Sequence, residues 1–177
     1  ISRGLVGSEM CIRDSKDSKI LNKLITIKEI DFIGFIFYQD SPRNVSDDLL
    51  QQLKDIDFKE KRPVCVYVNA SSSLIEETSS CFDNPVLQFH GDETNEFCKS
   101  FGKDFWKVIR VKDLSSIQKI SEYQNASAIL LENYEKGIYG GTGKSFDWDL
   151  MENIKTLDMK IIVLSLIHIS EPTRPRL

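Results

Sequence analysis

Short apolar runs alternate with amphipathic stretches along most of this chain, and this alternation restricts the fold more than any other feature of the sequence. The runs carry few charges and are rich in β-branched and aromatic residues, as strands buried on both faces of a parallel sheet are. The predicted strands are 32–38, 63–69, 85–90, 106–111, 128–133 and 160–163. Strands that alternate with helices in this way imply right-handed βαβ units.

The stretches between these runs have helical patterns with recognisable starts. Ser46 precedes two acidic residues in 46–56, which is typical of a capped first turn. Asp92 and Glu93 are expected in the first turn of a helix over 92–101, where their charges would favour the helix dipole. Further helices are predicted over 18–30, 71–82, 115–124 and 146–157.

Two α/β architectures accommodate this order of elements: an open doubly wound sheet and a closed (β/α)8 barrel. The compact spacing from strand to strand favours the barrel. No linker or low-complexity segment interrupts residues 16–163, so we expect one domain there. In both architectures, functional residues belong at the carboxyl ends of the strands.

Composition limits the classes of function. The chain has 177 residues, of which 41% are hydrophobic and 28% charged, and its net charge is −4. This balance is typical of a soluble globular protein, and it disfavours nucleic acid and membranes as partners. Cys65, Cys81 and Cys98 lack the spacing of metal ligands, which favours a reduced, cytoplasmic protein without a structural metal.

The two ends of the chain fit neither a strand nor a helix pattern. The peptides LVGSEMCIRDS and LSLIHISEPTR can be encoded by one DNA sequence read in opposite orientations. That DNA resembles a transposon-end adaptor of sequencing libraries, and non-native segments are excluded from fold reasoning. We therefore expect residues 1–15 and 164–177 to be adaptor-derived and residues 16–163 to be native. Cys11 and His168 then carry no function.

Three residues at predicted strand ends are candidates for chemistry. Glu132 ends an apolar strand, where it could act as a general acid or be a solvated glutamate. Arg43 follows a proline between a strand and a helix, where it could bind a carboxylate or phosphate or lie on the surface. His90 could be a base, a ligand or a hydrogen-bonded histidine.

The stretch GIYGGTGKS nearly matches the phosphate-binding loop GxxxxGK[ST], in which backbone amides surround phosphates. Gly143, Lys144 and Ser145 fit this pattern, but Ile138 stands where its first glycine belongs. The pattern alone leaves a P-loop-like nucleotide-binding module and a glycine-rich loop over a barrel mouth as alternatives.

Five motifs occur together: DFIGFIFYQDSPRNVS, RPVCVYVNAS, VLQFHGDE, WKVIRV and GGTGKSFDW. Their order and spacing resemble phosphoribosylanthranilate isomerase, a (β/α)8 barrel enzyme of tryptophan biosynthesis, and the resemblance covers essentially all of residues 16–163. Any one motif is weak, but five in order outweigh the P-loop pattern. The resemblance implies an incomplete TIM barrel, in which the first strand and the part from the end of strand seven through helix eight are missing or replaced.

The resemblance implies an isomerase that converts N-(5-phosphoribosyl)anthranilate to 1-(2-carboxyphenylamino)-1-deoxyribulose 5-phosphate by an acid–base Amadori rearrangement, with no cofactor. Glu132 matches the family's general acid, which is an aspartate, and its extra methylene moves the carboxyl group by about a bond length. Arg43 matches the arginine that contacts the anthranilate end of the substrate, and His90 matches a supporting histidine. The loop over the substrate is matched by Gly140, Gly141, Thr142 and Gly143.

Two features of the family have no counterpart in this sequence. One is the Lys-x-Cys-Gly motif that supplies the catalytic base, and the other is a glycine-rich phosphate loop after strand seven. Counting back from Gly34 puts the base inside the adaptor-derived segment. We therefore expect the source gene to encode the isomerase and the chain itself to be inactive.

Three alternatives stay open on the sequence. A related sugar-phosphate isomerase barrel of histidine biosynthesis would carry an aspartate where Arg110 ends its strand. A catalytically dead barrel and the P-loop-like module are the others. The sequence also leaves open whether the protein is fused to, or associated with, another tryptophan-pathway enzyme.

Overall fold

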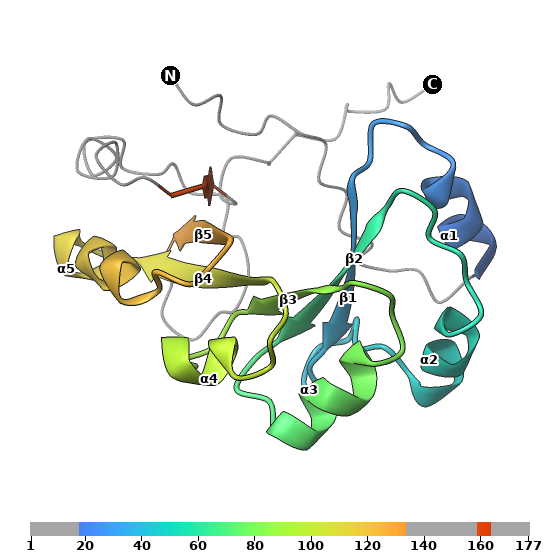
Figure 1. The fold of residues 1–177 in the computed structure, drawn as a ribbon, viewed down its shortest axis with the longest axis horizontal. Coiled ribbons are helices and arrows are strands. Elements are labelled where there is room, and N and C mark those ends of the chain that lie inside the picture. The colour runs from blue at the N-terminus through green and yellow to red at the C-terminus, as the bar shows by residue number, and fades with distance from the viewer. Residues whose placement is uncertain (1–17, 134–158, 164–177) are drawn as a thin grey trace, which may run out of the picture.

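The computed structural model describes residues 18–133 and 159–163, in which helices and strands alternate (Figure 1). The first half contains α1 (Ser18–Ile25), β1 (Phe32–Phe37), α2 (Asp47–Leu53), β2 (Arg62–Tyr67), α3 (Ser72–Ser79) and β3 (Val86–Phe89). The second half contains α4 (Asn95–Lys99), β4 (Phe105–Val111), α5 (Leu114–Gln118), the 3-10 helix η1 (Lys119–Glu122), β5 (Ala128–Asn133) and β6 (Ile161–Val163). Each predicted strand forms, and the predicted helix over 146–157 lies outside the described residues. Within the described part, no helix is long and apolar enough to cross a bilayer.

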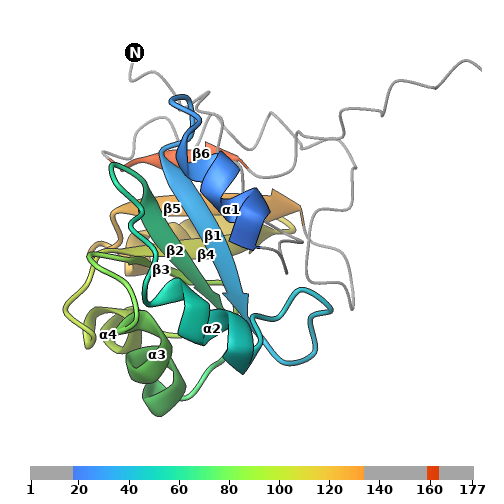
Figure 2. The same ribbon diagram turned by 90° about the vertical axis from the view of Figure 1, so that its right-hand side faces the viewer.

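All the described strands join one parallel sheet in the order β1-β2-β3-β4-β5-β6. Figure 2 shows β1 and β2 side by side at one edge, and β6 forms the other edge. A doubly wound sheet reverses its strand order at a switch point, whereas a barrel adds each strand next to the preceding one. The sequential order therefore confirms the (β/α)8 barrel type, and the doubly wound alternative is wrong.

The helices α1 to α5 lie along the outer side of the curved sheet (Figure 1), so the two faces of the sheet have different neighbours. Because side chains alternate along a strand, each strand supplies apolar residues to both faces. The helix-facing layer includes Ile33, Phe35, Cys65, Leu87, Phe89, Ile109 and Ile129, packed with Leu53, Ile75 and Ile117 of the helices. The inner layer contains Val64, Val66, Val86, Trp106, Val108, Ala128, Leu130 and Ile162.

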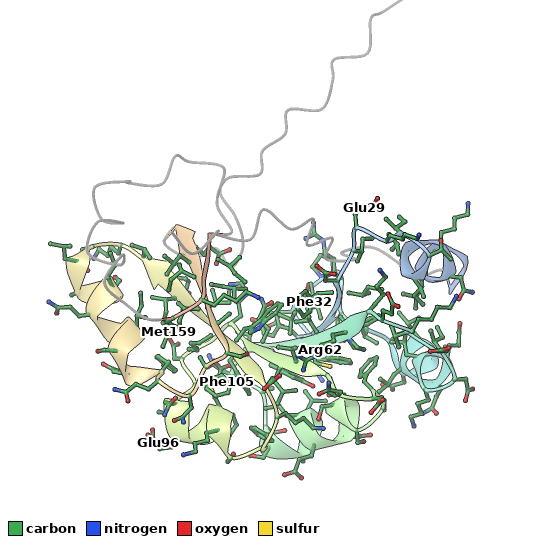
Figure 3. All side chains as sticks on the ribbon, turned by 45° about the horizontal axis from the view of Figure 1, so that its top comes forward. Glu29, Phe32, Arg62, Glu96, Phe105 and Met159 are labelled. Atoms are coloured by element: carbon green, nitrogen blue, oxygen red, sulfur yellow. The ribbon has the colours of Figure 1, made fainter. Side chains whose placement is uncertain are left out.

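At the amino-terminal ends of the strands the inner face is closed by aromatic rings. Phe32, the first residue of β1, packs edge-on against Trp106 of β4, with the ring centroids 4.8 Å apart. Figure 3 labels Phe32, Arg62 and Phe105 at the starts of β1, β2 and β4. Aromatic pairs of this geometry add about 0.5–1.5 kcal/mol to the free energy of their burial. This end of the sheet is therefore a packed base, and the carboxyl ends are left for chemistry.

The start of α4 differs from the prediction made from the sequence. Asp92 and Glu93 were expected in the first helical turn, but α4 begins at Asn95 and its capping residue is Thr94. The Thr94 hydroxyl accepts the N–H of Phe97 at 3.3 Å, which satisfies a donor of the first turn. The first-turn assignment of the two acids is therefore wrong, because their side chains bond elsewhere.

Candidate active site

The inner face of the sheet changes from apolar to polar toward the carboxyl ends of β3, β4 and β5. On β4, Val108 belongs to the inner apolar layer and Arg110 follows it on the same face. On β5, Leu130 and Glu132 repeat this order, and the strand register pairs Arg110 with Glu132. The polar residues therefore lie at the end of the sheet where ligands bind in barrels, next to an apolar layer.

His90 and Glu132 form a hydrogen-bonded pair at this end of the sheet. The imidazole Nε2 of His90 lies 2.8 Å from Oε2 of Glu132, and the two side chains are 14% and 4% exposed. The alternative that Glu132 is a solvated strand-end residue is therefore wrong. An imidazole and a carboxyl group at this distance can share one proton, carried by either the nitrogen or the oxygen. The pair is thus suited to giving up and recovering a proton in a sheltered position.

The backbone next to His90 is held by a close approach between the ends of β2 and β3. A Cβ on Gly91 would lie 2.6 Å from Cγ of Asn69 and 2.7 Å from its backbone nitrogen, so only glycine fits. Asn69 has a φ of 48°, in a region that asparagine adopts more readily than most residues. Its Oδ1 accepts the N–H of Asp92 at 2.7 Å. These contacts join the loops that follow β2 and β3.

A second pair, this one an ion pair, lies on the helix-facing side of the same strands. Nζ of Lys107 on β4 is 2.9 Å from Oε2 of Glu93, and both side chains are almost fully buried. Both buried charges also bond to the backbone: Lys107 donates to one carbonyl oxygen, and Glu93 accepts two N–H groups. Burial in this region raises the pKa of the Cys98 thiol to about 12, while Lys107 opposes the rise and Glu93 adds to it.

The described structure does not bring Arg43 into contact with the His90–Glu132 pair. Arg43 lies in the loop after β1, where its side chain is exposed and its N–H donates to Oγ of Ser41 at 3.2 Å. Among the described residues it forms no ion pair or hydrogen bond with Glu132. The expected loop residues Gly140, Gly141, Thr142 and Gly143, and the P-loop-like Lys144, lie outside the described residues.

Arg110 adds a cation beside the pair. Its Nη2 lies 3.4 Å from Oδ1 of Asp92, whose side chain is 79% exposed, and its strand neighbour on β5 is Glu132. An arginine paired in register with Glu132 and bonded to Asp92 supplies positive charge at the carboxyl end of the sheet. Such charge favours an anionic ligand.

Sequence reasoning missed the role of Lys107 and misplaced Glu93. A signal for Lys107 was present, because a lysine inside the apolar run WKVIRV must find partners if the strand is buried. The identity of its partner could not be predicted, since Glu93 reaches Lys107 from the loop after the preceding strand. That contact depends on how β3 and β4 pair.

Comparison with known families identifies what the chain is similar to. Residues 13–165 match the family described as "PRAI: N-(5'phosphoribosyl)anthranilate (PRA) isomerase". The N-(5'-phosphoribosyl)anthranilate isomerase of Nitrosomonas europaea is 41% identical over 122 residues, which are 68% of this chain and 58% of the relative. The enzyme of the same name from a Sulfurihydrogenibium species is 37% identical over 135 residues, which are 75% of this chain and 65% of the relative. The chain thus spans less than two thirds of the length of these curated relatives.

Solved structures agree with the fold. The crystal structure of phosphoribosyl anthranilate isomerase from Thermotoga maritima matches with a TM-score of 0.71 at 24% identity, over 83% of this chain and 72% of that one. A structure of such an isomerase in complex with reduced 1-(o-carboxyphenylamino)-1-deoxyribulose 5-phosphate gives a TM-score of 0.64 at 22% identity, over 81% and 69% of the two chains. At these identities the likeness concerns the barrel fold alone.

Proposed function

We propose that the protein to which this sequence belongs isomerises N-(5-phosphoribosyl)anthranilate, because the chain belongs to the family of N-(5'-phosphoribosyl)anthranilate isomerases. The observation that carries this proposal is the family match over residues 13–165. The reaction converts an aminoaldose phosphate to the aminoketose 1-(2-carboxyphenylamino)-1-deoxyribulose 5-phosphate. Its ligand is a small phosphosugar, and we assign the reaction to tryptophan biosynthesis in the cytoplasm.

In the proposed mechanism Glu132 is the general acid of the first step. Its carboxyl group gives a proton to the furanose ring oxygen as the C1–oxygen bond breaks, and the nitrogen lone pair forms the C1=N bond of a Schiff base. His90, 2.8 Å from the Glu132 oxygen, stabilises the carboxylate left behind and can help to restore its proton. This role is supported by the burial of Glu132 on the inner face of the sheet.

The second step requires a general base on the opposite side of the sugar. The base removes the C2 proton, the electron pair of that C–H bond forms the C1=C2 bond, and the electrons of the C1=N bond return to nitrogen. The resulting enolamine takes a proton at C1 and its C2 hydroxyl becomes the ketone. This sequence contains no Lys-x-Cys-Gly motif to supply that base, so we expect residues 1–177 alone to be inactive.

We assign the binding of the substrate's anthranilate end to Arg43. Its exposed guanidinium lies after the carboxyl end of β1, and a planar fork of donors binds a carboxylate in two parallel hydrogen bonds. We assign the cover over the substrate to the glycine-rich residues 140–143. Both assignments follow from matching positions in the family's motifs.

We further propose that residues 1–15 and 164–177 are translated adaptor DNA that replaced coding sequence on both sides. The support is the shared DNA that encodes both peptides in opposite orientations. Sequencing the locus with a library chemistry free of transposon adaptors tests this directly. A Lys-x-Cys-Gly strand upstream and a glycine-rich loop after Val163 are the expected result, and genomic confirmation of the present ends would overturn it.

The isomerase proposal is tested on the restored protein, with the present chain beside it. The restored protein should convert N-(5-phosphoribosyl)anthranilate and should rescue growth without tryptophan in a bacterium that lacks this isomerase. Glu132→Gln should lower kcat by about 100-fold or more, since it removes the transferable proton. Glu96→Gln, an exposed glutamate of α4, is the matched control and should leave kcat unchanged.

Glu132→Asp separates an impaired site from an adapted one. A rise in kcat would mean that the longer side chain is a handicap, and no rise would mean that the surrounding residues fit the glutamate. If the restored protein has no turnover, or if Glu132→Gln behaves like the Glu96 control, the proposed function is wrong.

A further inference from the structure

The buried pair of Lys107 and Glu93 is not used by the proposed chemistry. Their side chains are only 2% and 3% exposed. Removing two charges from water is costly, and apolar residues of the same volume are often equally stabilising in such places. The remaining hydrogen bonds of this pair indicate a more specific role than stability.

Both charged groups also bond to the peptide groups on either side of Gly91. Nζ of Lys107 donates to the carbonyl oxygen of Gly91 at 2.6 Å, and the N–H of Gly91 donates to Oε2 of Glu93 at 3.0 Å. The other oxygen of Glu93 accepts the N–H of Asn69 at 2.7 Å. One ion pair thus fixes two successive peptide groups and ties them to the end of β2.

Tyr123 fixes the pair from the side of η1. Its hydroxyl donates to the carbonyl oxygen of Glu93 at 2.8 Å, and Nζ of Lys107 lies 5.5 Å from the centre of its ring. The geometry of Lys107 and Glu93 is therefore determined by contacts from the loops after β2 and β3, from β4 and from the segment after η1. A group held in this way has little freedom to move.

His90 is the residue immediately before Gly91, so this network determines where its backbone lies. The peptide group between His90 and Gly91 is held by Glu93, and the N–H of His90 donates to the carbonyl oxygen of Tyr67 at 2.8 Å. From this fixed backbone the His90 ring reaches Glu132 on the opposite face of the sheet. A side chain on a fixed backbone has only a few staggered positions to choose from.

We propose that the Lys107–Glu93 pair positions His90 against Glu132, so that an ion pair on the helix-facing side of the sheet sets the geometry of the proton-sharing pair on the inner side. Lys107 and Glu93 are positioning residues in this scheme and touch no substrate. Apolar replacements would fill the same space but could not hold the two polar groups of Gly91. The inference rests on the proposed function only for the catalytic meaning of the His90–Glu132 contact.

The test observes His90 directly in the full 177-residue chain, without any turnover. The chain has two histidines, so a His168→Gln background leaves the ring nitrogens of His90 as the only imidazole signals in a long-range proton–nitrogen NMR spectrum. Glu132→Gln in this background gives the displacement of the Nε2 signal that corresponds to loss of the carboxyl partner. This reference makes the readout quantitative.

Two variants break the positioning pair, and a third removes it without leaving a charge unpaired. Glu93→Gln and Lys107→Met should each move the His90 Nε2 signal by an amount comparable to the Glu132→Gln reference. The double variant, which buries no lone charge, should do the same while remaining folded. Tyr123→Phe keeps both charges, and it should produce a smaller displacement in the same direction.

Asp104→Asn is the matched control. It breaks an ion pair of 3.0 Å between Arg62 and Asp104, at the amino-terminal ends of β2 and β4, and should leave the His90 signals unchanged. The proposal is overturned if every folded variant of Glu93, Lys107 and Tyr123 has the His90 signals of the parent chain. Failure of the isomerase assay would not move these signals, so the two proposals fail separately.

Discussion

Two buried acid–base pairs lie at the carboxyl ends of the same strands but on opposite faces of the sheet. His90 and Glu132 meet on the inner face at 2.8 Å, and Lys107 and Glu93 meet under the helices at 2.9 Å. The distances are alike, yet the surroundings differ. The helix-facing pair bonds to three backbone groups, whereas His90 is the hydrogen-bonding partner of the Glu132 carboxylate among the described residues.

This difference indicates a division of labour between structure and chemistry. Lys107 and Glu93 are bonded to each other and to the backbone on both sides of Gly91, so they hold neighbouring segments in place. Among the described residues, Glu132 bonds to the His90 imidazole at the carboxyl end of its strand, a geometry that allows proton transfer. Surrounding hydrogen bonds thus distinguish the pair that joins segments of the backbone from the pair to which we assign the chemistry.

The largest expected effect comes from breaking the helix-facing pair. Lys107→Met should lower the free energy of unfolding by about 3–5 kcal/mol, because it leaves the Glu93 carboxylate buried without its counter-charge. Urea unfolding followed by circular dichroism measures this loss. Adding Glu93→Gln to Lys107→Met should recover part of this loss. A double variant with a lower free energy of unfolding than Lys107→Met alone would contradict the role of the unpaired charge.

The next effect tests the close approach that joins the two pairs. Gly91→Ala should lower the free energy of unfolding by about 1–3 kcal/mol, because the new methyl group would overlap the Asn69 side chain and backbone. Gly102→Ala is the matched control, since Gly102 has a φ of 61° but open space around it. Its loss should be near 1 kcal/mol and come from backbone strain alone. Equal losses at both positions would argue against the crowding at Gly91.

The pH dependence of stability tests how well the surroundings of the helix-facing pair are shielded from water, because two titratable residues lie beside that pair. Burial raises the pKa of the Cys98 thiol from 9.0 to about 12, and burial likewise raises the pKa of Tyr123 from 10.0 to about 12. Each folded-state pKa lies above that of the unfolded chain, so ionisation of these groups favours unfolding. Their full contribution to the free energy of unfolding is present below about pH 9 and is lost as the pH rises toward 12. For Cys98 the free energy of unfolding should fall by about 1.4 kcal/mol per pH unit in that window.

Alkylation with iodoacetamide at pH 9, mapped by mass spectrometry, provides the independent measurement for Cys98. In the folded chain, iodoacetamide should modify Cys81, which is partly exposed, well before Cys98. In the urea-unfolded chain the two cysteines should react at similar rates. Rapid modification of Cys98 in the folded chain would mean that the region around the pair is open to solvent.

The smallest expected effect on stability comes from the inner pair. His90→Gln should change the free energy of unfolding by about 1 kcal/mol or less, since Gln can still donate a hydrogen bond toward Glu132 and the pair is close to the rim. The same urea experiment measures it beside Lys107→Met. A loss as large as that of Lys107→Met would mean that both pairs are structural, and the division between them would fail.

The sequence was informative wherever the signal was local. The apolar runs predicted the strands, and β5 has the predicted bounds of Ala128–Asn133. Ser46 caps α2 as expected, with its hydroxyl accepting the N–H of Leu49. The same local reasoning failed at Asp92 and Glu93, because acids before a helix resemble first-turn acids until their partners are known.

By itself the sequence determined the order of strands and helices and the residues at the carboxyl ends of the strands, and it favoured the barrel over the doubly wound sheet without deciding between them. Only the tertiary structure decided which of those residues meet. His90 and Glu132 are 42 positions apart in the sequence. They meet because β3 and β5 both flank β4, and His90 and Glu132 lie on the same face of the sheet at the same ends of these strands. Glu93 turns to Lys107 instead of the helix for the same reason. Periodicity reports how each segment is buried, but a partner is chosen by strand order and register, which are properties of the whole sheet.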